Sequence, residues 1–377
     1  MTSGADIVVI GAGIAGASVA GELASRGADV LLLEREEQPG YHSTGRSAAM
    51  FIETYGPEQM RRLTRAGRDW FMNPAPDLAD GPYLSDCGSL FVGYEGDEDR
   101  IEALVAEAKL TGSEIQIWTP AQVVARVPIM RADRLIAAVH EPGAMAIDVD
   151  RVLQSWLRLI KREKGRIETR AEVVSLRRQD GRWQIGLKGR DPITARVVID
   201  AAGAWADEVA ALAGVARVGL QPKRRTGIMI DLPAGVSSAG WPIVGDVAST
   251  FYFKADGGRL MLSPADETPV APQDIQPEEI DIAVAIDRFM TATTVEVRRP
   301  GRTWAGLRSF VADGEPVIGY EPEVPGFFWL AGQGGYGIQS SAGAARLAAS
   351  LVGGGGVPPA LATFGVSAQK VSPARFR

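Results

Sequence analysis

The sequence contains very little cysteine and histidine. Cys87 is the only cysteine among 377 residues, and His42 and His140 are the only histidines. A single cysteine excludes an intrachain disulfide and a cysteine-rich metal site, and two histidines leave little room for a zinc centre. We therefore expect no metal cofactor. The low cysteine content also fits a reducing compartment, so we expect a cytoplasmic protein.

The sequence also lacks an excess of positive charge and any long apolar run. It has 40 Lys and Arg against 46 Asp and Glu, a formal net charge of −6, which argues against nucleic acid or an anionic membrane surface as the partner. No apolar segment reaches the length of a membrane span. The apolar run at residues 7–10 is interrupted by glycines, which is typical of a strand and not of a signal peptide. A small-molecule partner is the expectation that remains.

The most informative stretch begins at that run. Residues 7–10 (IVVI) lead into Gly11, Gly13 and Gly16 and then a helical pattern, which is the strand, turn and helix of a dinucleotide-binding fold. Gly11 permits a tight turn, Gly13 allows backbone to approach a pyrophosphate, and Gly16 lets the helix lie close to the strand. The phosphates are then expected at the helix N-terminus, where unpaired N–H groups favour negative charge.

An acidic residue completes this pattern. A second apolar run, residues 30–33, ends at Glu34, where a carboxylate is placed to accept hydrogen bonds from an adenosine ribose 2′-OH. A carboxylate there argues against a 2′-phosphate and so against NADP. The motif by itself does not distinguish NAD from FAD.

Three later stretches fit the same domain. Residues 35–50 form a loop of small hydroxylic residues around Arg46, which suits packing against a phosphate and a flat ring, although a plain surface loop is the alternative. Two buried strands, 197–200 and 327–331, are each followed by small residues and a helix. Backbone can therefore approach a cofactor at both places.

The rest of the chain predicts a second domain. Residues 219–310 are rich in strands, expected at 226–231, 249–253, 259–262 and 294–298, with one helix near 277–290. We predict a mixed fold, α/β plus α+β. A discontinuous Rossmann-like FAD-binding domain takes residues 1–55, 145–215 and 312–377, and an inserted substrate domain built on an antiparallel sheet takes 56–144 and 216–311.

Four stretches carry a resemblance to a known family: residues 41–49 (YHSTGRSAA), 220–225 (LQPKRR), 303–314 (TWAGLRSFVADG) and 334–339 (GGYGIQ). With the glycine motif they resemble the D-amino acid oxidase superfamily of FAD enzymes over nearly the whole chain. Within it the chain most closely resembles D-arginine dehydrogenase and related bacterial D-amino acid dehydrogenases. The resemblance implies FAD and not NAD. It also implies non-covalent FAD, because Ser47 stands where covalent relatives carry a histidine.

The resemblance and the motifs together give a set of expected FAD contacts. The N–H groups at residues 335–338 open a helix and so suit negative charge on the reduced flavin. The expected contacts are Gly11, Gly13, Ile14, Ala15, Gly16, Glu34, Arg35, His42, Ser43, Thr44, Arg46, Ser47, Ala48, Ala49, Val173, Ala202, Gly203, Trp205, Gly332, Gly335, Tyr336, Gly337, Ile338 and Gln339.

The resemblance also implies substrate contacts. Arg308 is expected to grip a substrate carboxylate bidentately, although without the resemblance a structural ion pair is an equally good interpretation. Arg225 is expected as the second carboxylate contact, with Arg224 as the alternative, because neighbouring strand residues face opposite ways. The tyrosines have expected roles too: Tyr252 and Tyr336 bond the carboxylate or the amine, and Tyr55 belongs to a mobile lid.

Three departures from the relatives refine the substrate. Met50 stands where D-arginine dehydrogenase has a histidine, and no carboxylate lies around Ser89, where that enzyme holds a guanidinium. Both argue against D-arginine and indicate a neutral, apolar or bulky side chain, although Glu53 could supply a charge from the lid side. Met261 replaces the lysine that promotes oxygen reactivity in sarcosine oxidases, which favours a dehydrogenase over an oxidase.

The leading hypothesis is oxidative deamination of a D-amino acid to a 2-oxo acid and ammonia, by hydride transfer from Cα to flavin N5. The electron acceptor is left open, with a quinone or another carrier as candidates. An N-methyl or cyclic amino acid, or a 2-hydroxy acid, is the alternative substrate. A non-catalytic flavin-binding electron-transfer or regulatory protein is the alternative of another class.

Overall fold

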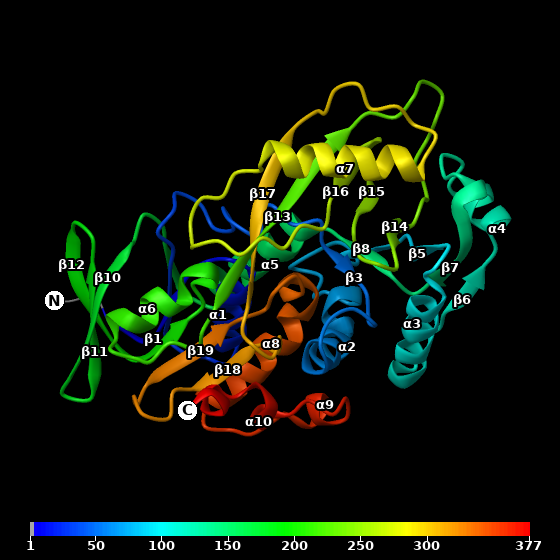
Figure 1. The fold of residues 1–377 in the computed structure, drawn as a ribbon. Helices are drawn as coiled ribbons and strands as arrows, with labels where there is room; N and C mark the ends of the chain where they lie inside the picture. Colours follow the sequence, from blue (N-terminus) through cyan, green and yellow to red (C-terminus); the bar gives the residue numbers. More distant parts are fainter. Residues whose placement is uncertain (1–3) are drawn as a thin grey trace.

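The computed structural model describes residues 4–377, apart from the side chains of residues 110 and 111, and contains three β-sheets (Figure 1). The first sheet has eight strands in the order β10-β11-β12-β1-β2-β9, with β19 paired to β12 and β18 paired to β19. Its strands are β1 (Ala5–Ile10), β2 (Val30–Leu33), β9 (Arg166–Glu168), β10 (Val173–Gln179), β11 (Arg182–Leu187), β12 (Arg190–Asp200), β18 (Val317–Tyr320) and β19 (Phe327–Ala331).

The centre of this sheet is parallel and buried on both faces. Strand β1 pairs in parallel with β2 and with β12, so that Val8 lies between Leu31 and Val198, and β12 pairs in parallel with β19. Continuous apolar sequence is what such a strand requires, since neither face meets water. The carboxyl ends of all four strands therefore lie at one edge of the sheet.

Helices and a hairpin cover the two faces. The helices α1 (Ile14–Ser25), α2 (Glu58–Met72), α5 (Val149–Arg162) and α8 (Gly337–Val352) share one apolar core with Ile7 and Val9 of β1. Val8 and Ile10 of β1 face the other core, formed with β10, β11 and α6 (Ala206–Leu212). This division follows from the alternation of side chains along a strand.

The second sheet has the order β17-β13-β16-β15-β14-β5-β7-β6 and is antiparallel except where β14 meets β5. Helix α7 (Glu279–Ala292) lies across it and packs through Ala285, Phe289 and Ala292 (Figure 1). The strands are β5 (Ser89–Tyr94), β6 (Gln116–Trp118), β7 (Leu135–Glu141), β13 (Gln221–Ile230), β14 (Ile243–Asp246), β15 (Tyr252–Asp256), β16 (Arg259–Ser263) and β17 (Thr303–Phe310).

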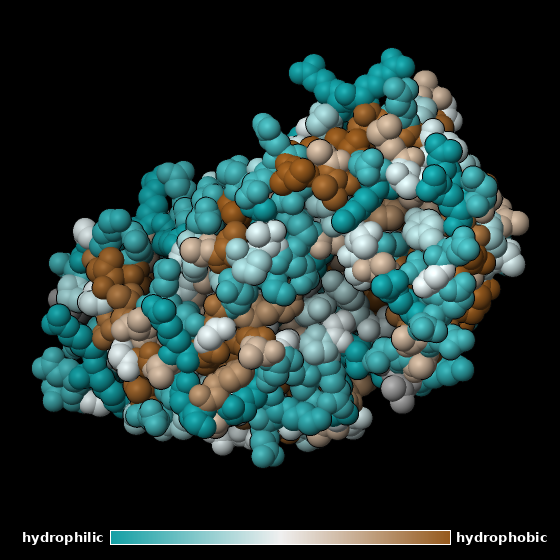
Figure 2. Space-filling model, in the orientation of Figure 1, coloured by the Kyte–Doolittle hydropathy of each residue, from teal (hydrophilic) through white to brown (hydrophobic). Residues whose placement is uncertain are grey.

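The remaining elements are a small sheet, further helices and 3-10 turns. A three-stranded sheet joins β3 (Met50–Phe51), β8 (Met145–Ile147) and β4 (Leu84–Asp86). The other helices are α3 (Glu98–Thr111), α4 (Pro120–Arg126), α9 (Pro359–Ala362) and α10 (Ala368–Val371), with 3-10 turns at Ala132–Arg134, Gly203–Trp205 and Pro373–Phe376. Figure 2 shows a largely hydrophilic face with separate apolar patches, one of them over α7, where Ile280 is 64% exposed. Within residues 4–377 we find no helix of the length and apolarity that crossing a membrane requires.

The predicted mixed fold is confirmed. The strands of the first sheet fall within residues 5–33, 166–200 and 317–331, and those of the second within 89–141 and 221–310. The limits predicted for the two domains stay a prediction. The strand expected at 294–298 is wrong: Thr294 donates its N–H to the Ile129 carbonyl at 2.7 Å and Val295 fills the core beside α7, so this segment packs as an irregular connection.

Gly343 sets how closely α8 approaches α2. A Cβ at this position would lie 2.2 Å from the backbone oxygen of Leu63, which cannot move away as a flexible side chain would. We expect Gly343→Ala to lower the free energy of unfolding by about 1–3 kcal/mol, the usual cost of overpacking, in denaturant titrations. Gly143→Ala is the control, since nothing lies within 4 Å of its added Cβ. Equal losses in the two variants would contradict the packing role.

Candidate active site

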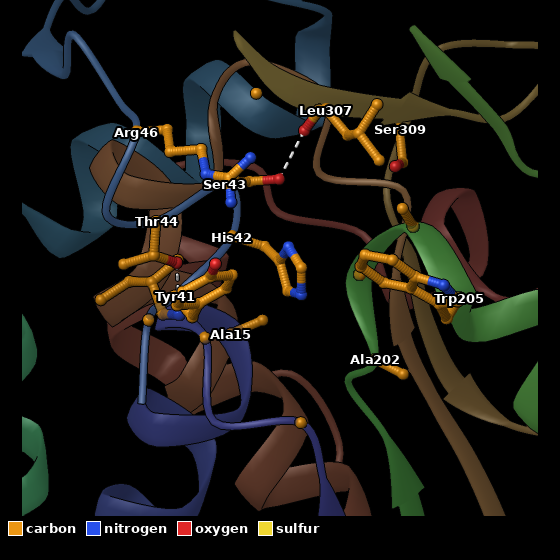
Figure 3. Close-up of a pocket in the computed structure, with 18 of the residues that line it drawn as sticks. Ala15, Tyr41, His42, Ser43, Thr44, Arg46, Ala202, Trp205, Leu307 and Ser309 are labelled. Atoms are coloured by element: carbon orange, nitrogen blue, oxygen red, sulfur yellow. Dashed lines mark hydrogen bonds between the residues drawn. The ribbon is translucent and has the colours of Figure 1, made fainter. Parts of the chain in front are cut away.

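A large cavity runs from the turn after β1 to the face of β17 (Figure 3). It begins where the carboxyl ends of β1, β2 and β12 meet, and it ends against residues of β13, β15, β16 and β17. Residues of the first sheet, of the second sheet and of the loop at 40–48 line it together. The cavity is therefore shared between the two sheets.

The turn after β1 is built on close backbone contacts. Gly11 has a φ of +99°, and a Cβ there would lie 2.6 Å from the Ala201 carbonyl oxygen. A Cβ on Gly16 would lie 1.8 Å from the Gly11 carbonyl oxygen, so α1 sits directly against the turn. Both contacts need glycine. The N–H groups of the first turn of α1 have no acceptor within the helix, and Gly13, Ile14 and Ala15 at this end of the helix line the cavity.

Two side chains hold this turn in place. The Glu34 carboxylate is buried and accepts hydrogen bonds from the N–H groups of Ala12, at 2.9 Å, and Glu36, at 3.0 Å. The Thr44 hydroxyl accepts from the Ile14 N–H at 3.0 Å. Glu34 lines the cavity while fixing the turn, so its expected contact with a ribose hydroxyl stays a prediction.

The loop at 40–48 ties the two sheets together. Ser43 donates to the Leu307 carbonyl of β17 at 2.6 Å, and Arg46 donates to the Asp274 carboxylate at 2.5 Å and to the Ala305 carbonyl at 3.1 Å. Figure 3 shows Thr44, Ser43 and Arg46 on one side of the cavity and Trp205 on the other. The loop places the β1 turn and β17 on opposite ends of one cavity.

The side of the cavity opposite Thr44 is aromatic and cationic. The Arg35 guanidinium lies 3.8 Å from the centre of the Trp205 ring, and the His42 ring lies 4.6 Å from it. His42 Nε2 is 2.9 Å from a Glu36 carboxylate oxygen, which orients the imidazole. Flat rings with a nearby cation suit a flat ligand with phosphate groups.

Most predicted cofactor positions line the cavity. They are Gly11, Gly13, Ile14, Ala15, Glu34, Arg35, His42, Ser43, Thr44, Arg46, Ser47, Ala48, Val173, Ala202, Gly203, Trp205, Gly335, Gly337 and Ile338. Gly16, Ala49, Gly332, Tyr336 and Gln339 are not among the lining residues, and neither are Met50 and Tyr55 of the substrate set. Their contact roles stay predictions.

Gln339 has a different visible task. Its buried side chain accepts from the Ile52 N–H at 3.1 Å and donates to the carbonyl oxygens of Ile52 and Tyr55, both at 3.3 Å. The Tyr55 ring in turn packs edge-on against Tyr336, with ring centres 4.8 Å apart. Gln339 thus fixes the segment that carries Tyr55 to the start of α8.

The pairing of β13 with β17 decides which arginines face the cavity. Lys223 lies opposite Arg308, and Arg225 lies opposite Gly306, so these cations share one face of the sheet. Arg225 and Arg308 both line the cavity. Arg224 points the other way, is 4% exposed and binds Glu278 and Asp281. This register shows that Arg225, and not Arg224, faces the cavity, and its contact with a carboxylate stays a prediction.

Arg308 is the cation with the fewest partners in the cavity. Its Nη1 donates to the Tyr55 hydroxyl at 3.2 Å, and within residues 4–377 it forms no salt bridge. A Cβ on Gly335 would lie 2.8 Å from the guanidinium, so the backbone at the start of α8 passes directly beside it. A permanent positive charge with free N–H donors remains available to an anion.

The charges of the two arginines act on the neighbouring phenols. Burial raises the pKa of Tyr252, but the positive charges of Arg308 and Arg225 outweigh burial and bring its pKa below the usual value. Burial raises the pKa of Tyr336 to about 12, with Tyr55 adding to the rise. The cavity end at Tyr252 therefore favours anions.

Other lining residues were not predicted as contacts. Gln333 lines the cavity, and its Nε2 is buried with no hydrogen-bond partner in the part of the chain described. It lies inside the glycine-rich run 332–339, which was the available signal. Trp304 and Tyr41 also line the cavity, and the available signal was that they lie in the stretches 303–314 and 41–49 that carry the resemblance. The unpartnered Gln333 amide, beside close-packed glycine backbone, fits a bound dinucleotide with polar ring edges.

Among residues 4–377 no group of His, Cys, Asp and Glu is arranged to hold a metal ion.

A family of sequences described as FAD dependent oxidoreductase matches residues 6–351. The chain belongs to this family. FAD is therefore its cofactor. Gly13, Ala15, Trp205 and Gln333 line the cavity, and we expect them to hold it. Like its family, the chain is an FAD-dependent oxidoreductase.

The chain also resembles individual proteins in sequence and in fold. FAD-dependent oxidoreductase domain-containing protein 1 of Mus musculus is 24% identical over 403 residues, which cover 92% of the chain and 81% of that protein. L-proline dehydrogenase from P. horikoshii superposes with a TM-score of 0.85 at 20% identity and covers 100% of the chain and 98% of its own. Glycine oxidase from Geobacillus kaustophilus superposes at 0.84 with 21% identity, over 97% and 99% of the two chains. The present chain therefore shares its fold with L-proline dehydrogenase and glycine oxidase.

The lowered pKa of Tyr252 predicts a pH dependence of anion binding. Below that pKa the phenol is neutral, and above it the phenolate cancels part of the positive charge of Arg308 and Arg225. We therefore expect the affinity of the flavin-loaded protein for a simple carboxylate to fall as pH rises toward the usual phenol range. Tyr252→Phe removes this decrease, whereas Tyr336→Phe leaves it, because the pKa of Tyr336 is about 12. Flavin absorbance titrations across pH test it, and a pH-independent affinity in the unmodified protein contradicts it.

Proposed function

We propose that the chain deaminates a D-amino acid with one carboxylate and a neutral side chain, giving a 2-oxo acid and ammonia. The observation that carries the proposal is Arg308, a cation inside the FAD cavity whose only hydrogen bond in the part of the chain described is to the Tyr55 hydroxyl. A substrate carboxylate would complete its coordination. The D configuration rests on the sequence resemblance at residues 41–49, 220–225, 303–314 and 334–339.

The two solved relatives support an amino acid as the substrate. One is a dehydrogenase of L-proline and the other an oxidase of glycine, and both have the fold of this chain. Because L-proline carries a secondary amine, an N-substituted or cyclic amino acid is the second candidate substrate for the same cavity. Arg308 would hold its carboxylate in the same way.

The proposed chemistry asks little of the side chains. Bound FAD supplies the acceptor for two electrons. The substrate loses a hydride from Cα and a proton from its nitrogen, and water hydrolyses the resulting imino acid to the 2-oxo acid and ammonia. Arg308 would orient the carboxylate, and the Tyr55 hydroxyl would lie beside it. A substrate that binds with a neutral amine needs no side-chain base.

Three residues bear on the finer assignment. Met261 lines the cavity and offers a thioether where a lysine would place a charge, so we propose a dehydrogenase that passes electrons to a quinone or another carrier. Ser47 also lines it, in keeping with non-covalent FAD. Glu53, a possible source of charge from the lid side, forms a salt bridge with Arg68 at 2.9 Å, so its negative charge is already balanced by a cation.

Substitution of Arg308 tests the carboxylate contact. We expect Arg308→Ala to raise KM or the ligand Kd by about 100-fold or more, the loss typical of a charged hydrogen-bonded pair, while the flavin spectrum stays that of bound FAD. Arg308→Lys keeps the charge but loses the bidentate geometry, so its KM or Kd should lie between those of the unmodified protein and Arg308→Ala. Unchanged binding in Arg308→Ala would reject the role.

A substrate panel tests the reaction itself. The flavin-loaded protein is mixed anaerobically with D- and L-amino acids, N-methyl and cyclic amino acids and 2-hydroxy acids, and bleaching of the flavin band is recorded. We expect neutral D-amino acids to bleach it and their L-enantiomers not to. Bleaching by L-amino acids alone would overturn the stereochemical assignment, and bleaching by 2-hydroxy acids alone would overturn deamination.

Met261 predicts how the reduced protein meets oxygen. We expect O2 to reoxidise the reduced flavin slowly compared with a quinone or dye. In Met261→Lys we expect reoxidation by O2 to be about tenfold faster or more, because a cation beside the reduced ring stabilises developing negative charge. Met261→Leu is the control of matched size. Stopped-flow reoxidation measures all three proteins. Fast reaction of the unmodified protein with O2 would identify an oxidase.

A further inference from the structure

One carboxylate bridges two cations at the wall of the cavity. Glu267 Oε1 accepts from Arg225 Nη2 at 3.0 Å, and its Oε2 accepts from Lys223 Nζ at 2.9 Å. Arg225 lines the cavity and its side chain is 12% exposed, while the Glu267 side chain is 46% exposed. A nearly buried guanidinium that faces a cavity needs such a partner, because an unpaired buried charge is costly.

The backbone under Glu267 is fixed by its neighbours. The Asp266 carboxylate accepts from the Thr226 N–H at 2.7 Å and from its hydroxyl at 3.0 Å, and the Asp266 carbonyl accepts from Arg225 Nε at 2.8 Å. The Thr268 carbonyl accepts from the Arg224 N–H at 2.9 Å. Residues 266–268 thus run along β13 like an added edge, and the position of Glu267 is set by the fold.

The charges on this face do not cancel. Lys223, Arg225 and Arg308 lie on one face of the β13–β17 pair, and Glu267 neutralises one of the first two. The Asp266 carboxylate accepts a hydrogen bond from the Thr226 N–H, and its Oδ2 lies 3.6 Å from Nε of Arg224, which is on the opposite face. Arg308 forms no salt bridge within residues 4–377. In the described part of the chain, this face therefore keeps Arg308 without a salt bridge, available to a ligand carboxylate, and Arg225, which Glu267 already holds.

We propose that Glu267 determines which amino acids the site accepts: it holds Arg225 and repels a second carboxylate, so that substrates with one carboxylate and an uncharged side chain are selected. The inference rests on the proposed function for its substrate class. Selection by an unfavourable like charge is a common way to exclude a close analogue. Glutamine in place of Glu267 keeps the shape and removes the charge, leaving Arg225 open to a second ligand carboxylate.

The test compares two ligands that differ only in that charge. Glutarate and its monoamide cannot be oxidised at an amine, so their Kd values for the flavin-loaded protein follow from perturbation of the flavin absorbance. We expect the unmodified protein to bind the monoamide at least as well as glutarate, and Glu267→Gln to shift the ratio of the two Kd values toward glutarate by about tenfold. Turnover of D-glutamate against D-glutamine should shift the same way.

Two further variants keep the result interpretable. Glu296→Gln removes the same charge from an exposed pair with Arg298 and should leave the ratio unchanged. Lys223→Gln leaves Glu267 with Arg225 alone, so it should shift the ratio of the two Kd values toward the monoamide. This variant tests the role of Glu267 if Glu267→Gln does not fold. A ratio unchanged in both variants, or an unmodified protein that already prefers glutarate, overturns the proposal. If no amino acid bleaches the flavin, the proposed function fails while the two Kd values still decide the role of Glu267.

Discussion

The parallel pairing of β1 with β2 and β12 is the constraint on which the site depends. It aligns Ile10 with Leu33 and with Asp200, so that Gly11, Glu34 and Ala201 leave the sheet side by side. The contact between them is tight, because a Cβ at Gly11 would lie 2.6 Å from the Ala201 carbonyl oxygen. Three segments far apart in sequence therefore form one end of the cavity, and the fourth, the start of α8, lies there because β19 pairs with β12.

The other end of the cavity depends on a second register. Pairing of β13 with β17 puts Arg225 and Arg308 on one face and sends Arg224 to a separate ion-pair cluster with Glu278 and Asp281. A shift by one residue in either strand would exchange these roles, since the side chains of a strand alternate. Ser43 and Arg46 then bond to β17 and its surroundings, which joins the two ends into one cavity.

Electrostatics gives this cavity its chemical character. Membership of the family identifies FAD as the cofactor, and the balance of charges on the β13–β17 face of the cavity comes from Arg308, Arg225, Lys223 and Glu267. The lowered pKa of Tyr252 reports the excess of positive charge from within the structure. A site of this kind suits a carboxylate ligand, and the position of Glu267 limits how many carboxylates it tolerates. The proposed preference for an amino acid and the proposed preference for an uncharged side chain thus have separate physical sources.

The sequence by itself determined the parts that obey local rules. The glycines of the first turn, the acid at Glu34 and the buried strands follow from spacing and hydrophobic pattern, and the structure places them as predicted. Local rules failed at 294–298, where apolar and β-branched residues fill a core without forming a strand. The tertiary structure alone decided which arginine faces the cavity, that Gln339 holds the Tyr55 segment, and that Glu267 bridges Arg225 and Lys223. Each of these depends on strand register or on contacts between distant segments, and no local pattern of residues encodes them.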